Sequence, residues 1–104
     1  MCRKESIDRL NGFDEQFFMY GEDLDLCFRM QELGQKVIWY PQYTVTHLKY
    51  QSGLQSSDAK TKSSIRWHFY DAMEKFYLKH YNKRYCVCIN TLILSVIQLK
   101  KRLV

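Results

Sequence analysis

The feature that most constrains this chain is an acidic and aromatic run between Gly12 and Arg29, with the sequence GFDEQFFMYGEDLDLCFR. Within it, Glu22, Asp23 and Asp25 are almost adjacent, although the chain as a whole carries a net charge of +5. Carboxylates this close repel one another unless a cation, a proton or a substrate needs them. The run therefore indicates a functional cluster; the alternative is a solvated, acid-rich first turn of a helix.

The bulk composition is that of one small folded domain. The chain has 104 residues, of which 46% are hydrophobic, so it can form a core and is not of a disordered type. Its four cysteines lack the spacing of a disulfide framework or a zinc site, so we expect reduced thiols and a cytoplasmic protein. The first ten residues are charged and do not form a signal peptide.

The pattern after the acidic run predicts a small α/β unit. Residues 22–33 have helical spacing, with acids in the first turn and Gly34 as a stop signal. Residues 37–40 are β-branched and aromatic and read as a strand that ends at Pro41; residues 44–47 read as a second short strand. We therefore expect a helix, two short strands and then two C-terminal helices.

Three regions follow from the change in composition along the chain. Residues 1–53 hold the acidic run and the two expected strands, residues 54–62 form a mobile polar loop, and residues 63–104 form a helical region. A helix is expected from about Ser64 to Tyr81, with one apolar stripe.

The last segment, residues 86–102, is apolar and closes with three basic residues. It is too short to span a bilayer, which takes roughly 20 apolar residues. It fits a helix at a membrane interface with basic anchors, and equally a helix buried against a partner. The positive charge of the second half would suit a membrane surface, but an ordinary solvated basic face explains it as well. No nucleic-acid motif is present, so we expect no nucleic-acid partner.

The acids have separable roles on these grounds. Glu22 and Asp23 would occupy the first helical turn, where the helix dipole stabilises anions and where a carboxylate can act as a general base. Asp25 is spaced to pair with Arg29 at i+4, a structural role.

The aromatic residues before these acids, including Phe18 and Tyr20, would form an apolar wall for a ring-shaped ligand such as a sugar. His47 ends the second expected strand and could return to the edge that carries Asp23, where histidine and aspartate would suit Mn or Mg. A lone histidine is more often an ordinary hydrogen-bonded residue. The EF-hand alternative fails because Phe28 and Gly34 occupy the positions that need Gly and Glu.

The string from Gly12 to Arg29, followed by Gly34, by Trp-Tyr-Pro at residues 39–41 and by His47, resembles the C-terminal half of inverting glycosyltransferases of family 2. The rhamnosyltransferase-like enzymes of bacterial cell-surface polysaccharide synthesis are the most similar group. The resemblance covers residues 1–53 well and continues more loosely over residues 67–81.

The resemblance implies the C-terminal portion of a GT-A fold that transfers a sugar from a nucleotide-sugar donor to a glycan or lipid-linked acceptor, at the cytoplasmic face of the membrane. It implies that Asp23 is the general base and that Glu22 orients the acceptor or the base. It also implies that His47 is a ligand of a divalent metal, Mn or Mg, which holds the donor diphosphate. Phe18, Tyr20 and Gly21 would contact the acceptor.

The family's donor-binding half has no counterpart in this chain. We therefore expect a fragment that is inactive alone and can self-associate through an uncovered sheet edge. The alternative from another class of protein is a non-catalytic module that docks on a membrane or a partner through its C-terminal segment.

Overall fold

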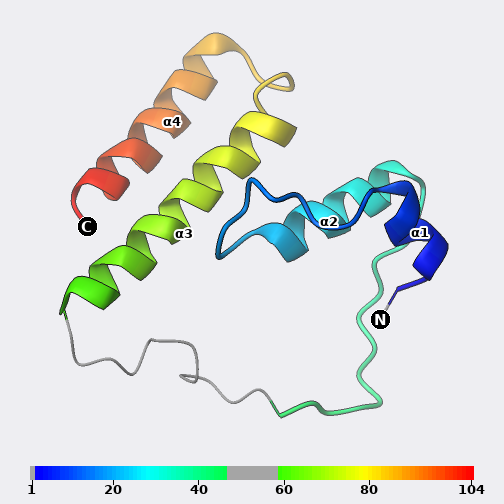
Figure 1. Ribbon diagram of the computed structural model, residues 1–104. Coiled ribbons are helices and arrows are strands. Elements are labelled where there is room, and N and C mark those ends of the chain that lie inside the picture. The colour runs from blue at the N-terminus through cyan, green and yellow to red at the C-terminus, as the bar shows by residue number, and fades with distance from the viewer. Residues whose placement is uncertain (1, 47–58) are drawn as a thin grey trace.

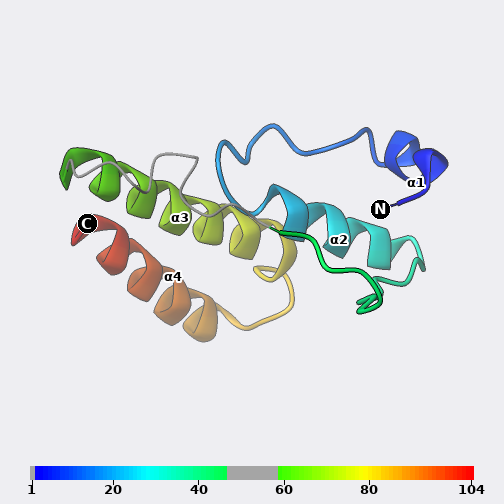
Figure 2. The same cartoon turned by 90° about the horizontal axis from the view of Figure 1, so that it is seen from below.

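The computed structural model describes residues 2–46 and 59–104, and these contain four helices and no strand. The helices are α1 (Lys4–Arg9), α2 (Glu22–Glu32), α3 (Ala59–His80) and α4 (Val87–Arg102). Helices α3 and α4 form an antiparallel hairpin, α2 lies beside the C-terminal end of α3, and α1 lies beyond the far end of α2 (Figures 1 and 2).

The molecule is open rather than spherical. Its radius of gyration is 16.4 Å, whereas about 13 Å is typical of a compact domain of this length. The buried apolar side chains are correspondingly few: Phe17, Leu26, Met30, Ile65, Ala72, Tyr77 and Ile97. They come from the loop before α2 and from α2, α3 and α4, and much apolar surface stays exposed.

A glycine lies next to each end of helix α2 in the sequence. Gly21 is the N-cap with φ of 85°, and Gly34, with φ of 75°, follows the C-cap Leu33. Both angles lie in the left-handed region, which favours glycine. A Cβ at Gly21 would also lie 3.2 Å from the ring of Phe17, so the loop that leads into α2 is packed tightly at this point.

The hairpin of α3 and α4 is closed by one buried amide. Asn90 accepts a hydrogen bond from the hydroxyl of Tyr77 at 2.8 Å, and its own amide nitrogen donates to the carbonyls of Asn82 and Tyr85 at 2.8 and 3.1 Å. One side chain thus joins the two helices to the turn between them.

The predicted α/β fold is wrong. Residues 37–40 and 44–46 have no regular structure, and His47 lies outside the described residues. A strand needs a neighbouring strand to pair its backbone N–H and C=O groups, and the described residues supply none. Strand-type composition at residues 37–46 was thus insufficient to form a sheet.

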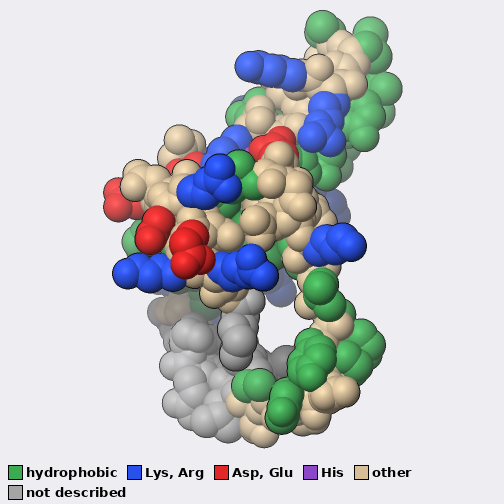
Figure 3. All heavy atoms as spheres, turned by 90° about the vertical axis from the view of Figure 1, so that its right-hand side faces the viewer, with side chains coloured by type: hydrophobic (Ala, Val, Ile, Leu, Met, Phe, Trp, Pro, Cys, Tyr) green, Lys and Arg blue, Asp and Glu red, His purple; other side chains and the backbone are tan. Residues whose placement is uncertain are grey.

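The segment instead runs away from the helices with its large apolar side chains in solvent (Figure 3). Trp39 and Val45, for example, are 84% and 86% exposed. Helix boundaries also differ from those expected. Helix α3 begins at Ala59, so residues 59–62 are helical although the sequence placed them in a loop, and the short helix α1 was not expected at all.

Candidate functional site

Asp23 is the second residue of helix α2 and its side chain is exposed. One carboxylate oxygen accepts a hydrogen bond from the backbone N–H of Leu24 at 2.8 Å. Asp23 also lines a groove of about 770 Å³, which we call the Asp23 groove. The groove is also lined by Arg3, which precedes α1, by Phe13, and by Val37 and Ile38 of the segment after α2. Its volume is in the range of small-molecule sites.

Glu22 precedes Asp23 and is half-buried. Its Oε2 atom is buried and has no hydrogen-bond partner among the described residues. A buried polar atom of this kind normally needs a partner, such as water or a ligand. Glu22 and Asp23 are therefore adjacent in sequence but differ in access to solvent.

The aromatic residues expected beside the acids are distributed over different surroundings. Phe18 is 76% exposed, with its ring 5.1 Å from that of His68. Tyr20 contacts the ring of Phe69 at 6.0 Å and lines a second groove, between α3 and α4. Neither Phe18 nor Tyr20 is among the described residues that line the Asp23 groove.

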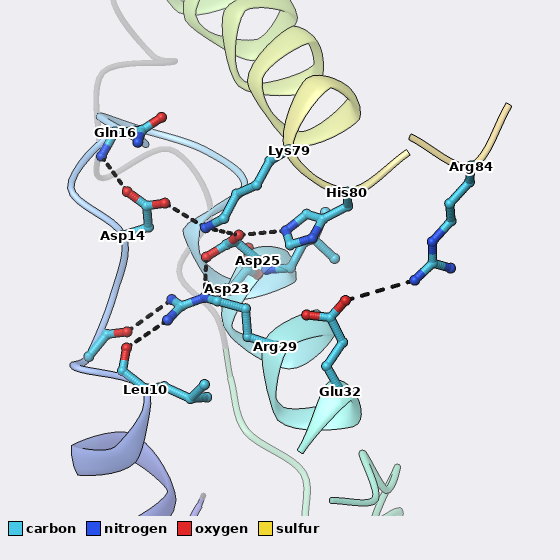
Figure 4. Close-up of polar contacts among 12 residues, drawn as sticks. Leu10, Asp14, Gln16, Asp23, Asp25, Arg29, Glu32, Lys79, His80 and Arg84 are labelled. Carbon is cyan, nitrogen blue, oxygen red and sulfur yellow. Dashed lines mark hydrogen bonds and ion pairs between the residues drawn. The ribbon is translucent and has the colours of Figure 1, made fainter. Parts of the chain in front are cut away.

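Asp25 is the most enclosed charged residue of the site, with 0% of its surface exposed. Arg29 donates to its Oδ2 atom at 2.7 Å, as the i, i+4 spacing predicts, while Lys79 and His80, at the end of α3, lie 2.7 Å from its Oδ1 atom. Figure 4 shows the two α3 residues reaching down onto the carboxylate. We call these four residues the Asp25 cluster.

The charges of the Asp25 cluster stabilise one another. Burial acts to raise the pKa of Asp25, but hydrogen bonds from Lys79, His80 and Arg29 outweigh it, and the pKa is lowered from its ordinary value of 3.8. Because Asp25 is then a carboxylate that can only accept, the Nε2 atom of His80 is the donor between them.

The pKa of Lys79 is shifted in the opposite direction to that of Asp25. Burial acts to lower its pKa, but hydrogen bonds to Asp14 and Asp25 raise it above 10.5. Asp14 in turn has a lowered pKa, mainly because of the hydrogen bond from Lys79. Both ends of the contact are thus charged at neutral pH.

The cluster also fastens the loop that precedes α2. Arg29 donates to the carbonyls of Leu10 and Gly12 at 2.8 and 2.9 Å, in addition to its contact with Asp25. Lys75 of α3 donates to the carbonyl of Gln16 at 2.9 Å. The acidic turn is therefore held from α3 on one side and from residues 10–16 on the other.

No role at this site was predicted for Lys79 and His80. They lie more than fifty residues from Asp25, and no local pattern links them to it. One signal was present at the Asp25 end: an acid next to the apolar residues of α2, with an arginine at i+4, is typical of a buried ion pair.

The expected metal ligand, His47, lies outside the described residues. In the ranges 2–46 and 59–104, no group of three or more His, Cys, Asp or Glu residues is arranged to hold a metal ion. The described residues therefore do not form a metal site by themselves.

The arrangement separates two tasks among three acids. The charge of Asp25 is balanced by cations and inaccessible, so it fixes the turn. Asp23 is exposed at the helix N-terminus and lines a groove, so it can accept a proton from a bound hydroxyl group.

The amino-acid sequence of the chain is similar to those of known glycosyltransferases. Residues 1–51 match the family described as the N-terminal domain of galactosyltransferase. The rhamnosyltransferase WbbL of Escherichia coli is 37% identical over 68 residues, which are 65% of this chain and 24% of that protein. No solved structure matches the chain significantly.

Two mycobacterial proteins are similar to a shorter stretch of the chain. The N-acetylglucosaminyl-diphospho-decaprenol L-rhamnosyltransferase of Mycobacterium tuberculosis is 37% identical over 49 residues, 47% of this chain and 16% of that protein. The pre-mycofactocin glycosyltransferase of the same species is 40% identical over 47 residues, 45% of this chain and 10% of that protein. The chain thus spans a quarter or less of each relative's length, and within that span it is similar to rhamnosyltransferase-like glycosyltransferases of family 2.

Proposed function

We propose that this chain is the acceptor-side segment of an inverting glycosyltransferase, with Asp23 as the general base. The observation that carries the proposal is the position of Asp23: exposed, at the N-terminus of α2, and lining a groove. The donor would be a nucleotide-sugar and the acceptor a lipid-linked glycan or a growing cell-surface polysaccharide. The diphospho-decaprenol in the name of one relative supports a lipid-linked acceptor.

The proposed reaction is a single displacement. The Asp23 carboxylate takes the proton of the acceptor hydroxyl, whose oxygen forms a bond to the anomeric carbon as the bond to the nucleotide diphosphate breaks. Attack opposite the leaving group inverts the configuration at that carbon. A divalent ion, Mn or Mg, with His47 as a ligand, would neutralise the diphosphate when bound.

The donor-binding portion would lie in the part of the relatives that this chain does not cover, so we expect the segment to be inactive alone. The test is Asp23→Asn in the complete enzyme that contains the segment, with Asp8→Asn, another exposed aspartate, as control. Sugar transfer should fall by at least 100-fold, in line with loss of a general base, while donor binding persists. Turnover retained in the Asp23 variant would rule out this role.

A second candidate function, docking on a membrane surface, is favoured by the outer face of α4. Exposed apolar residues recur there at spacings of three and four: Ile89, Leu92, Val96, Leu99 and Leu103. We call them the α4 stripe. Basic residues at positions 100–102 follow the helix to its end. No helix among the described residues is long and apolar enough to cross a membrane.

An apolar stripe with basic residues at one end suits the interface of an anionic bilayer. We infer a peripheral location on the cytoplasmic face of the membrane, which Leu92→Ser/Leu99→Ser would weaken in vesicle co-sedimentation. Equal sedimentation of the wild-type chain with and without anionic vesicles would contradict it. Self-association through the exposed segment 37–46 is proposed as a competing use of apolar surface, and sedimentation velocity distinguishes the two.

A further inference from the structure

A second groove lies at the open end of the α3–α4 hairpin, away from the turn that joins the two helices. It has a volume of about 480 Å³, and we call it the hairpin groove. Its walls come from α3 through Ile65, Arg66 and Phe69, and from the end of α4 through Lys100 and Leu103. Tyr20, from the loop that leads into α2, also lines it, so the groove adjoins the segment that carries Asp23.

The two cations of the groove have no acidic partner among the described residues. Arg66 and Lys100 are exposed, one on each helix, and neither forms an ion pair there. Lys101, the next residue on α4, is by contrast held by Asp71 at 2.6 Å and by Glu74 at 3.1 Å. The cation that faces α3 is thus neutralised, while the two at the groove can bind an anion.

The chemistry of these cations favours phosphate. A guanidinium donates two parallel hydrogen bonds to phosphate oxygens, and an ammonium adds a compact positive charge. Val104 also lines the groove, and its main-chain oxygen accepts a hydrogen bond from the hydroxyl of Ser63 at 2.6 Å.

The rest of the lining is apolar. Ile65 forms part of the core, while Phe69 and Leu103 remain 49% and 75% exposed. Leu103 is also the last member of the α4 stripe, so apolar surface continues from the groove along α4. A free phosphate would leave this surface uncovered, whereas a phosphate joined to a hydrocarbon chain would cover it.

We propose that the hairpin groove binds the diphosphate and the first isoprenoid units of a lipid-linked acceptor. This inference rests on the proposed function and assigns the lipid end of the acceptor to α3 and α4. Arg66 and Lys100 bind the diphosphate, and Phe69 and Leu103 contact the hydrocarbon.

The test measures binding of farnesyl diphosphate to the full chain by isothermal titration calorimetry, with inorganic pyrophosphate as the ligand that lacks a hydrocarbon. Arg66→Gln/Lys100→Gln should weaken the binding of farnesyl diphosphate at least tenfold, as expected for loss of charge-assisted hydrogen bonds. The control, Lys83→Gln/Arg9→Gln, also removes one lysine and one arginine from exposed positions and should leave binding within twofold.

A second variant tests the apolar wall. Leu103→Ala should weaken the binding of farnesyl diphosphate several-fold and leave the binding of pyrophosphate unchanged, because it removes only hydrocarbon contact. Circular dichroism of each variant verifies that the helices are retained. The proposal is overturned if pyrophosphate binds as tightly as farnesyl diphosphate, if the groove and control variants lose affinity equally, or if no binding occurs.

The same titration separates this inference from the role of Asp23. Asp23→Asn should bind farnesyl diphosphate like the wild-type chain. If the Asp23 variant of the complete enzyme still transfers sugar while the groove variants lose the lipid diphosphate, the base assignment fails and the groove stands. If the groove variants lost binding to plain anionic phospholipid vesicles to the same extent as binding to farnesyl diphosphate, the groove would be a general headgroup site. That result would contradict the proposal.

Discussion

Asp23 and Asp25 show how far two residues of the same type can diverge within one helical turn. Asp25 points inward, where Arg29, Lys79 and His80 surround it, and Asp23 points outward into a groove. A carboxylate enclosed by cations cannot exchange protons with a substrate, but it fixes the backbone of its neighbour. The functional acid therefore depends on the structural one for its position.

Removing the charge of Asp25 should destabilise the fold. Asp25→Asn leaves Arg29 and His80 at a buried site without their shared carboxylate, which typically costs about 3 kcal/mol. Urea unfolding followed by the helical circular dichroism signal measures the loss. The exposed control, Asp8→Asn, should change the free energy of unfolding by less than about 0.5 kcal/mol. Equal effects of the two variants would mean that the cluster does not hold α2 to α3.

At the scale of the helices, the α3–α4 hairpin depends on Asn90. Asn90→Leu keeps the approximate volume but removes three hydrogen bonds and leaves the hydroxyl of Tyr77 without a partner. A buried group left unsatisfied costs about 1–3 kcal/mol, so the variant should lose about 2 kcal/mol or more in thermal or urea unfolding.

Tyr77→Phe provides the graded comparison, because it removes only one of these bonds and should cost about 1 kcal/mol. If Tyr77→Phe proved as damaging as Asn90→Leu, the bonds from Asn90 to the turn would contribute nothing.

The three longer helices were predictable and the strands were not, for one physical reason. Helices α2, α3 and α4 pair their backbone groups within themselves, so local spacing, an acidic first turn and Gly34 were enough to predict them. A strand pairs with residues elsewhere, and at residues 37–46 local composition carried no information about whether such residues exist. The start of α3 was misplaced because its first turn, with the sequence AKTK, is polar like a loop.

The site was predictable to a similar extent. Local sequence was sufficient to single out Asp23 and the pair of Asp25 with Arg29. The contacts from Lys79 and His80 arise only when α3 folds back onto α2, and the aromatic residues near Asp23 separated because Phe17 entered the core while Phe18 faced solvent. Each of these outcomes depends on tertiary packing, which no spacing rule encodes.

For the whole molecule, paired acids and lysines predict the pH range of stability. Asp14, Asp25, Asp71 and Glu74 have lowered pKa values, so each stabilises the fold fully above its ordinary pKa and loses that contribution as the pH falls through the lower folded value. Lys79 and Lys101 have raised pKa values, so their contribution is present below 10.5 and is lost as the pH rises through the higher folded value.

The free energy of unfolding should therefore be nearly constant from about pH 5 to about pH 10 and should fall outside that range. Urea titrations at intervals of one pH unit measure the profile. In Asp25→Asn the acidic decline should be shallower, because one of the responsible carboxylates is absent. Stability that increased between pH 5 and pH 3 would have the wrong sign for this account.

Arg29 holds the chain before α2 through hydrogen bonds to main-chain atoms alone. Its guanidinium donates to the carbonyl oxygens of Leu10 and Gly12, and every amino acid presents such an oxygen. The identity of the side chain at position 10 is therefore irrelevant to this attachment. Lysine at position 29 would keep the charge but lose the planar fork that reaches all three acceptors. A change of side chain at position 10 is thus compatible with this attachment, whereas a change at position 29 is not.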